Sequence, residues 1–170
     1  MEPSEIAAEL AAPGAAELLE STAAHLSYVG PDGSPRVVPV GVFWTGAAFV
    51  VSTAATAPKV AAIDARPDVA LAIDSGDTPG SARALSVRGR ASVEIVDGAV
   101  PEYLAAARRS MDADAAAAFE RNVRRMYTRM ARIAITPTWV RFYDYGAGRL
   151  PAFLRELAEQ QQLSEADWAD

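Results

Sequence analysis

The chain has 170 residues, 51% of them hydrophobic, and a formal net charge of −6 at pH 7, which predicts one domain with a real core and excludes general disorder. It has no cysteine and a single histidine, which excludes disulfides, thiolate sites and zinc sites built on several histidines, so we expect no metal site. The negative charge argues against general affinity for nucleic acid or membranes, and no apolar run approaches the roughly 20 residues that a membrane-spanning helix needs.

The first residues of the chain are acidic, unlike the basic start of a secretory signal, so we expect a cytoplasmic protein. The spacing of apolar residues then predicts a helix over 4–20 with a break at Pro13 and Gly14. Alternating apolar residues follow, separated by short links that are rich in turn-forming residues. They predict three strands in an antiparallel meander, over residues 25–29, 36–44 and 48–53.

The rest of the chain alternates between helical and strand patterns. The expected elements are, in order, a helix over 58–65, a strand over 69–74, a loop over 76–81, a strand over 82–96, helices over 101–111 and 112–130, a strand over 132–143 interrupted at 136–138, and a helix over 151–162. The second of the paired helices carries one stripe of core-facing residues. Its members are Ala115, Phe119, Asn122, Val123, Met126 and Met130.

Together these elements predict six antiparallel strands in meander order, with helices inserted between them. That pattern favours a closed or partly closed barrel over a doubly wound sheet. No internal repeat or long linker interrupts the chain. We therefore expect one α+β domain over residues 1–170 that is mainly β.

The most informative stretch is the end of the third strand and the start of the helix that follows. Hydroxyl side chains at Ser52, Thr53 and Thr56 precede a helix that begins at Pro58, and the next residue, Lys59, is the only lysine of the chain. The N–H groups at a helix N-terminus bind anions, and hydroxyls and a lysine add donors and charge. The stretch predicts a phosphate site, with an ordinary capped helix and a solvated lysine as the alternative.

A second unusual stretch lies inside the second strand. Proline within a strand removes a ladder donor, and glycine permits close approach of another group to the backbone. Pro39 and Gly41 therefore predict that this strand faces something other than a strand, such as a planar ring lying against the backbone. An edge strand with a bulge is the alternative interpretation.

These motifs occur in a characteristic order between about residues 21 and 142. They are a hairpin with Pro-Asp-Gly, a strand with Val-Val-Pro-Val, a strand ending in Ser-Thr, the run Thr-Ala-Pro-Lys, a helix closed by Arg-Pro-Asp-Val, and a later strand with Val-Arg-Gly-Arg-Ala. The order resembles the pyridoxamine 5′-phosphate oxidase-like split-barrel superfamily. That resemblance implies a six-stranded antiparallel split β-barrel, a homodimer, a flavin or deazaflavin cofactor at the subunit interface and a small-molecule substrate.

The resemblance also implies roles for particular residues. Lys59 resembles the ligand of the cofactor phosphate, and the strand from Val38 to Val40 resembles the wall behind the ring. Trp139 and Arg141 would close the pocket from the partner subunit. The cofactor-binding residues expected on this basis are Val38, Pro39, Val40, Ser52, Thr53, Thr56, Ala57, Pro58, Lys59, Trp139 and Arg141. No side chain is assigned as a catalytic acid or base.

The chain departs from the pyridoxamine 5′-phosphate oxidases themselves. Those enzymes carry an arginine where this chain has Pro58, and their Ser-Arg-Pro segment, which grips the substrate phosphate, has no equivalent here. The closer likeness is to the branch that binds the deazaflavin coenzyme F-420, which implies hydride transfer to a small organic acceptor. An FMN-dependent oxidase or reductase, and a cofactor-binding protein without turnover, are the alternatives.

A group of arginines near the end of the second paired helix bears on the choice of cofactor. They are Arg121, Arg124, Arg125, Arg129 and Arg132. Coenzyme F-420 ends in an oligoglutamate tail, which a local basic surface would hold, whereas FMN ends at its phosphate. The alternative is a solvated face that pairs with Glu120 and other acids.

Four further titratable residues are expected to have no part in the chemistry. His25 lies on a short alternating strand, where a structural role is expected. Asp74, Asp77 and Glu94 are expected to be turn and surface acids, since their spacing does not suggest a metal site.

Overall fold

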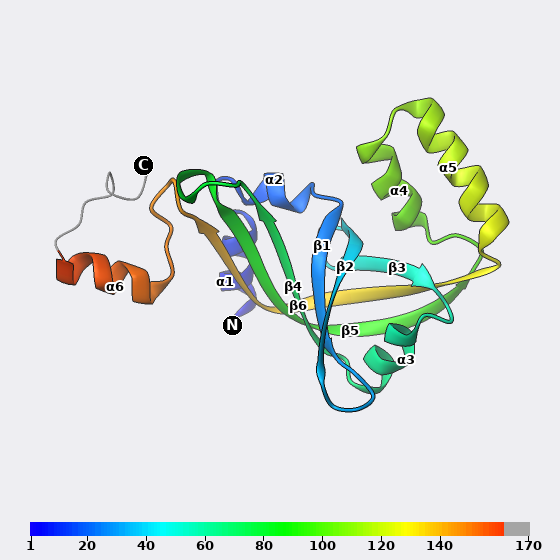
Figure 1. Ribbon diagram of the computed structural model, residues 1–170, viewed down its shortest axis with the longest axis horizontal. Helices are drawn as coiled ribbons and strands as arrows, with labels where there is room; N and C mark the ends of the chain where they lie inside the picture. The colour runs from blue at the N-terminus through cyan, green and yellow to red at the C-terminus, as the bar shows by residue number, and fades with distance from the viewer. Residues whose placement is uncertain (162–170) are drawn as a thin grey trace.

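A computed structural model of the protein describes residues 1–161, in which six strands form a barrel with helices on its outside (Figure 1). The strands are β1 (Ala23–Val29), β2 (Pro35–Trp44), β3 (Phe49–Ala54), β4 (Asp68–Ser75), β5 (Arg83–Asp97) and β6 (Arg129–Asp144). The helices are α1 (Pro3–Leu10), α2 (Ala15–Leu19), α3 (Pro58–Ala65), α4 (Pro101–Ser110), α5 (Ala113–Met126), α6 (Ala152–Gln161) and the 3-10 turn η1 (Pro79–Ser81). Residue 162, the expected end of the last helix, lies outside the described residues.

The sheet is a closed antiparallel barrel in the order β1-β2-β3-β6-β5-β4. The mainly β class and the antiparallel barrel are confirmed, but the expected meander order is wrong. The strands instead form two three-stranded meanders, β1-β2-β3 and β4-β5-β6. These are joined because β3 pairs with β6 and β1 pairs with β4. Closure in this order pairs the outer strands of the two meanders with each other.

The barrel is split between β2 and β3. These strands pair only from Val42 to Trp44 on β2 and from Phe49 to Val51 on β3. Beyond that point, residues 35–41 of β2 stay with β1, whereas residues 52–54 of β3 continue along β6. The two strands therefore diverge, and each leaves one edge unpaired by the described strands.

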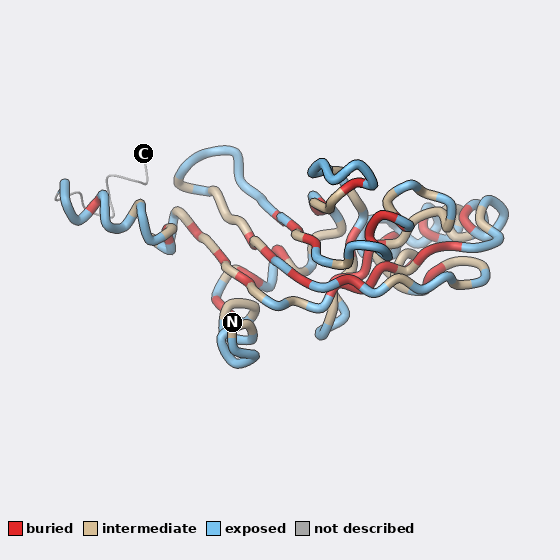
Figure 2. Tube along the Cα trace, turned by 90° about the horizontal axis from the view of Figure 1, so that it is seen from below, coloured by how far each residue is buried: buried red, intermediate tan, exposed pale blue. Residues whose placement is uncertain are grey.

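The core fills the barrel, and the buried segments follow the strands (Figure 2). The largest fully buried side chains on the strands include Leu26, Phe49, Leu71, Ile73, Leu85 and Phe142. Each such side chain contributes roughly 1.5–3 kcal/mol relative to an exposed one. Alternation places residues 85, 87, 89, 91, 93 and 95 on one face of β5, and this is confirmed for Leu85, Val87 and Ala91, which belong to the core, whereas Ile95 is 39% exposed.

The interruption expected at 136–138 is a bulge, and β6 runs through it without a break. The register shifts between Arg88 and Gly89, so that Gly89 lies opposite Pro137 and Arg88 lies opposite Trp139. A Cβ atom at Gly89 would lie 2.7 Å from the Thr136 carbonyl oxygen, so the close approach of the strands requires glycine here. The extra residue lets the strand bend without losing its partner.

A smaller core lies between the barrel and the hairpin of α4 and α5, which sit side by side at one end (Figure 1). It contains Val100, Leu104, Val123 and Met130. The expected helix over 112–130 is too long, because α5 ends at Met126 and β6 begins at Arg129. Pairing of Arg129 with Asp97 on β5 draws these residues into the sheet, which overrides their helical pattern.

The expected stripe on this helix is wrong in part. Val123 is buried and Phe119 packs against the core, but Ala115 and Asn122 are exposed. Met126 is 71% exposed at the end of the helix, whereas Met130 is 1% exposed and reaches the same core from β6. Helical spacing cannot describe a stripe that passes from a helix into a strand.

The terminal helices lie away from this hairpin. Glu9 fastens α1 to β6, since its carboxylate accepts hydrogen bonds from the Phe142 N–H at 2.9 Å and from Arg141 Nη1 at 3.1 Å. Helix α6 extends from the other end of the barrel (Figure 1). No helix in the described part of the chain is long and apolar enough to cross a membrane.

Candidate functional site

The loop from β3 to α3 presents unpaired donors at the side of the split. Helix α3 begins at Pro58, and its N-cap residue, Ala57, has no side chain that can accept the first helical N–H groups. Lys59 is half-buried, and none of the ion pairs formed by the described residues involves it. An uncapped helix N-terminus beside a lysine without an acidic partner has the polarity that an anion requires.

The hydroxyl groups of this loop add to that polarity. Ser52 and Thr53 lie at the end of β3, where Arg132 and Ala131 of β6 are their sheet partners, and Thr56 is exposed in the loop. Within the described residues these three hydroxyls make no hydrogen bond. They remain available to a ligand.

The second strand supplies the opposite side of the split. Val38 and Val40 turn their side chains inward and pack against the barrel core, whereas Pro39 and Gly41 are exposed on the outer side. Val42 N–H donates to the Thr22 carbonyl at 3.1 Å and so faces the β1 side. Because N–H groups alternate in direction along a strand, those of Gly41 and its odd-numbered neighbours face the split.

This geometry explains why a proline is tolerated within the strand at position 39. The nitrogen of Pro39 faces the unpaired edge, so the missing N–H costs the sheet no hydrogen bond. The backbone of this segment, and not the side chains of Val38 and Val40, is what a ligand in the split would touch.

Trp139 and Arg141 lie far from this loop within one chain. They are on β6 beyond the bulge, opposite Arg88 and Ser86 of β5. Arg141 lies nine residues along β6 from Arg132, which is roughly 30 Å along an extended strand. Arg141 already binds Glu9, and its guanidinium lies 5.8 Å from the Trp139 ring. A role for this pair at the split needs a second copy of the chain, as the resemblance implied.

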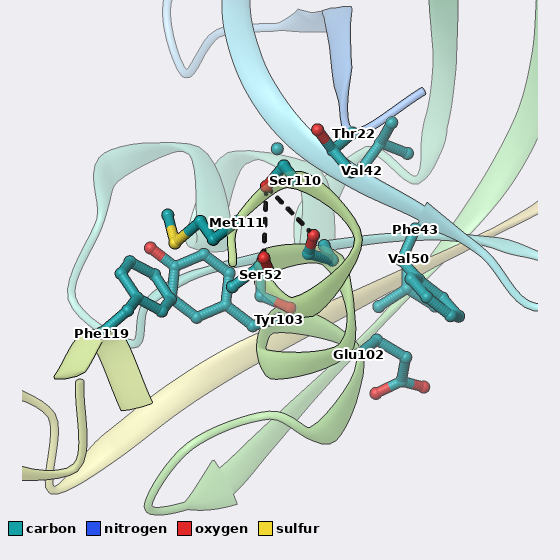
Figure 3. A pocket seen from close by; sticks show the side chains of 13 residues that line it. Thr22, Val42, Phe43, Val50, Ser52, Glu102, Tyr103, Ser110, Met111 and Phe119 are labelled. Atoms are coloured by element: carbon teal, nitrogen blue, oxygen red, sulfur yellow. Dashed lines mark hydrogen bonds between the residues drawn. The ribbon is translucent and has the colours of Figure 1, made fainter. Parts of the chain in front are cut away.

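One feature was missed at the level of sequence. A hollow of about 140 Å³ lies between the outer face of β2 and β3 and the α4–α5 hairpin (Figure 3). Its lining residues include Gly41, Phe43, Ser52, Tyr103, Ala106 and Phe119. The run of alanines from 105 to 107 on α4 was the available signal, because small side chains on the sheet-facing side of a helix leave space.

A family model described as pyridoxamine 5'-phosphate oxidase matches residues 13–144 of the chain. The protein belongs to this family. The match covers the whole barrel, including the split and the loop before α3, and all of the α4–α5 hairpin that follows β5. The family includes oxidoreductases, as its description states.

Solved structures with the same fold differ in the functions that their names state. An F-420 reductase is 30% identical with a TM-score of 0.55, over 73% of this chain and 93% of its own. The conserved hypothetical protein Rv2991 from Mycobacterium tuberculosis is 22% identical with a TM-score of 0.61, over 89% of each chain. The haem storage protein HutZ from Vibrio cholerae is 13% identical with a TM-score of 0.55, over 75% of this chain and 89% of its own. Because their identities are low, the last two show the fold alone. A search of curated proteins found no match.

In this member of the pyridoxamine 5'-phosphate oxidase family the arginines near α5 do not form one free basic surface. Arg132 donates to Glu102, Arg124 donates to Glu120 at 2.7 and 3.0 Å, and Arg129 lies 3.8 Å from Asp97. Glu120 also accepts from Arg108, and these hydrogen bonds from Arg124 and Arg108 lower its pKa. Arg121 and Arg125 form no ion pair with a described residue.

The single histidine lies in the sheet of the barrel. His25 is on β1, and its Nδ1 atom is 3.7 Å from Asp74 Oδ1 on the neighbouring strand β4. This pair was not expected, because Asp74 comes 49 residues later and only the β1–β4 pairing brings the two together. The structure thus gives His25 an acidic partner on the neighbouring strand.

Proposed function

We propose that this protein is an oxidoreductase that binds the deazaflavin coenzyme F-420 in the split and transfers a hydride to a small organic acceptor. The observation that carries the proposal is Lys59, the only lysine, at the uncapped start of α3 without an acidic partner among the described residues. A charge-assisted hydrogen bond from such a lysine to a phosphate is worth roughly 1.5–3 kcal/mol.

The residues around the split fit the two parts of such a cofactor. Lys59, with its own backbone N–H, and the hydroxyl of Thr56 would hold the phosphate, because Pro58 has no N–H and those of Ala57 and Val60 donate to the Ala54 and Ala57 carbonyls. The unpaired edge of β2 at Pro39 and Gly41 would lie against the planar ring, with Ser52 and Thr53 at the end of β3. The phosphate-binding set follows the end of β3, and the ring-binding set lies on β2 and β3, which diverge at Val42 and Val51, so one elongated ligand would touch both.

Two observations favour the deazaflavin over FMN. The 30% identical relative with this fold is an F-420 reductase. Arg121 and Arg125, which have no acidic partner among the described residues, would attract the oligoglutamate tail that FMN lacks. FMN is the alternative cofactor, in an oxidase or reductase of the same fold.

The cofactor, when bound, supplies the hydride, and the side chains of this protein bind and orient it. No side chain at the split is assigned as an acid or base. We propose a homodimer in which Trp139 and Arg141 of one copy close the pocket of the other. The unpaired edge of β2 supports this assembly, because Val37 on that edge is 66% exposed.

An absorbance spectrum of the purified protein, followed by titration with F-420 and with FMN, tests the cofactor. Tight binding of F-420 and weak binding of FMN is the expected result, and the reverse order would make the protein an FMN enzyme. Turnover of reduced cofactor with an artificial acceptor tests the activity. Binding without turnover for any acceptor would favour the rival interpretation, a cofactor-binding protein that is not an enzyme.

A further inference from the structure

The outer face of β1 carries the single histidine of the chain. Ala24 and Leu26 are buried in the barrel core, so the alternation of the strand directs His25, which lies between them, outward. The His25 side chain is 56% exposed. The residues on either side of it on this face of β1, and the one opposite it on β4, are small. They are Ala23, Ser27 and Ala72. The imidazole can therefore be reached from outside the barrel.

One carboxylate faces this imidazole. Asp74 on the adjacent strand β4 places its Oδ1 atom 3.7 Å from Nδ1 of His25, and this is the one ion pair that His25 forms with a described residue. Other charged residues lie on the elements that pack against β1, but they do not pair with His25. They are Arg36 of β2, Asp68 of β4, and Lys59 and Asp64 of α3. Asp74 is therefore the charged group that orients the His25 ring.

The other nitrogen of the ring is free, and the residue opposite it belongs to the predicted cofactor site. No hydrogen bond or ion pair between described residues involves Nε2 of His25. In the ladder of β1 and β2, His25 lies directly opposite Pro39, and both side chains are on the outer face. Side chains paired in this way have Cβ atoms about 4.5–5.5 Å apart. His25 is thus one strand away from the segment of β2 that we propose to lie against the ring of the cofactor.

We infer that His25, oriented by Asp74, is the general acid that supplies the proton when the hydride is transferred. This inference rests on the proposed function, and it replaces the structural role that the sequence predicts for His25. It also implies that the acceptor contains a polarised double bond, because the addition of a hydride to such a bond leaves an electron pair that must take up a proton.

The atoms and electrons of this step balance. A C–H bond forms between the hydride of the reduced cofactor and the electron-poor carbon of the acceptor, and the π bond breaks. The electron pair left on the neighbouring atom takes the proton from Nε2 of the His25 imidazolium. The acceptor is reduced by two electrons, the cofactor is oxidised, and the neutral imidazole regains a proton from water. Histidine suits this role because its charge changes near physiological pH.

A first test follows the imidazole itself by NMR. The chain has one histidine, so the full-length protein gives a single set of imidazole signals. Titration with F-420 is expected to shift them, because the cofactor would bind one strand away from His25. Binding of F-420 by fluorescence with the imidazole signals unmoved would overturn the inference and leave the cofactor site standing. Absence of F-420 binding would overturn the inference together with the proposed function.

A second test measures turnover of reduced F-420 with cyclohexenone, a small acceptor that has a polarised double bond. His25→Asn is expected to lower kcat by about a hundredfold and to leave F-420 affinity within about twofold. The wild-type kcat should fall as pH rises through the midpoint at which the imidazole NMR signals titrate. This fall should be absent from His25→Asn, and His25→Gln repeats the comparison with a second neutral side chain.

The role of Asp74 has a matched control in the loop that follows β4. Asp74→Asn removes the charge that faces Nδ1 and is expected to lower kcat by about tenfold. Asp77→Asn, at another exposed acid three residues away, is expected to leave kcat within about twofold. Circular dichroism checks the fold of each variant. Wild-type turnover that folded His25→Asn or His25→Gln retains in full would overturn the inference alone, whereas absence of wild-type turnover would overturn it together with the proposed activity.

Discussion

Arg132 on β6 donates from both Nε and Nη2 to the same oxygen of Glu102 on α4, at 2.9 and 2.6 Å. Both side chains are partly buried, with 27% and 17% of their surface exposed. The pair fastens the α4–α5 hairpin to the outside of the barrel. It also removes one arginine from the group that sequence spacing placed on a single basic surface.

This ion pair predicts an acid-sensitive contribution to stability. Burial by itself raises the pKa of Glu102, but hydrogen bonds from Arg132 and from its own backbone N–H, with the charge of Arg132, bring it below the ordinary 4.5. A carboxyl group with a lowered folded-state pKa stabilises fully above the unfolded value, and this stabilisation is lost as pH falls through the folded value. Glu102→Gln should lower the free energy of unfolding at pH 7 by about 1–3 kcal/mol.

Urea unfolding at a series of pH values measures this effect. The variant's disadvantage should begin to shrink below about pH 4.5, where the carboxyl group of the unfolded wild type takes up a proton, and should be lost as pH falls through the lower folded-state pKa. Glu156→Gln, at an exposed acid on α6, is the matched control and should change the free energy of unfolding by less than about 0.5 kcal/mol. Identical acid limbs for Glu102→Gln and wild type would show that the pair contributes nothing.

Two methionines placed on one helical stripe by their spacing should differ sharply in their effect on stability. Met130→Ala removes a side chain that is 1% exposed in the hairpin core and should cost about 2–5 kcal/mol in the free energy of unfolding. Met126→Ala removes one that is 71% exposed and should cost less than about 0.5 kcal/mol. Thermal or urea unfolding measures both losses. Equal losses would contradict the burial of Met130 and favour the longer helix with both methionines on one face.

Lys59→Ala should weaken cofactor binding by about 1.5–3 kcal/mol, roughly ten- to a hundredfold. The free energy of unfolding should change by less than about 0.5 kcal/mol, because Lys59 has no ionic partner among the described residues. Lys59→Arg keeps the charge and should retain most of the affinity. Fluorescence titration measures binding, and unchanged affinity of Lys59→Ala for both F-420 and FMN would exclude the phosphate role.

The proposed dimer predicts a measurable effect at the open edge of β2. Light scattering at micromolar concentration should give the molar mass of a dimer. We expect the interface to bury about 1,600 Å² or more of total surface. Val37→Asp should weaken the dimer and the cofactor affinity together, since it places a charge on an apolar contact. Met126→Asp, at an equally exposed apolar residue on α5, is the control. A wild-type monomer would contradict a pocket completed by Trp139 and Arg141 of a partner.

Arg121 and Arg125 on α5, which form no ion pair with a described residue, predict how salt affects binding of the cofactor tail. Contacts between exposed charges are screened, with a Debye length of about 10 Å at 0.1 M salt. Affinity for long-tailed F-420 should therefore fall with salt more steeply than affinity for the tailless deazaflavin core. Reversing Arg121 and Arg125 together to Glu should remove that difference and leave FMN binding unchanged. Equal affinities for the two deazaflavins at every ionic strength would make these arginines a solvated helix face.

Local patterns in the sequence determined most of the elements of this protein. Helix α3 begins and ends at the expected residues, because Pro58 suits a first helical turn and Pro67 stops the helix soon after its end. The alternation on β5 identified its core-facing side, since side chains on a strand point to opposite faces. The loop with Lys59 and the edge position of Pro39 were likewise found from residue types that have a local physical meaning.

Only the tertiary structure decided which distant segments meet. The pairing of β3 with β6 and of β1 with β4 depends on strand edges that no local pattern distinguishes, so the expected meander order was wrong. Pairing of β6 with β5 made Arg129 the start of a strand, and packing of the α4–α5 hairpin on the barrel engaged Arg132 with Glu102 and left a hollow in front of Gly41. These features arise from contacts between residues far apart in the chain, whereas sequence periodicity reports only the face that each segment buries.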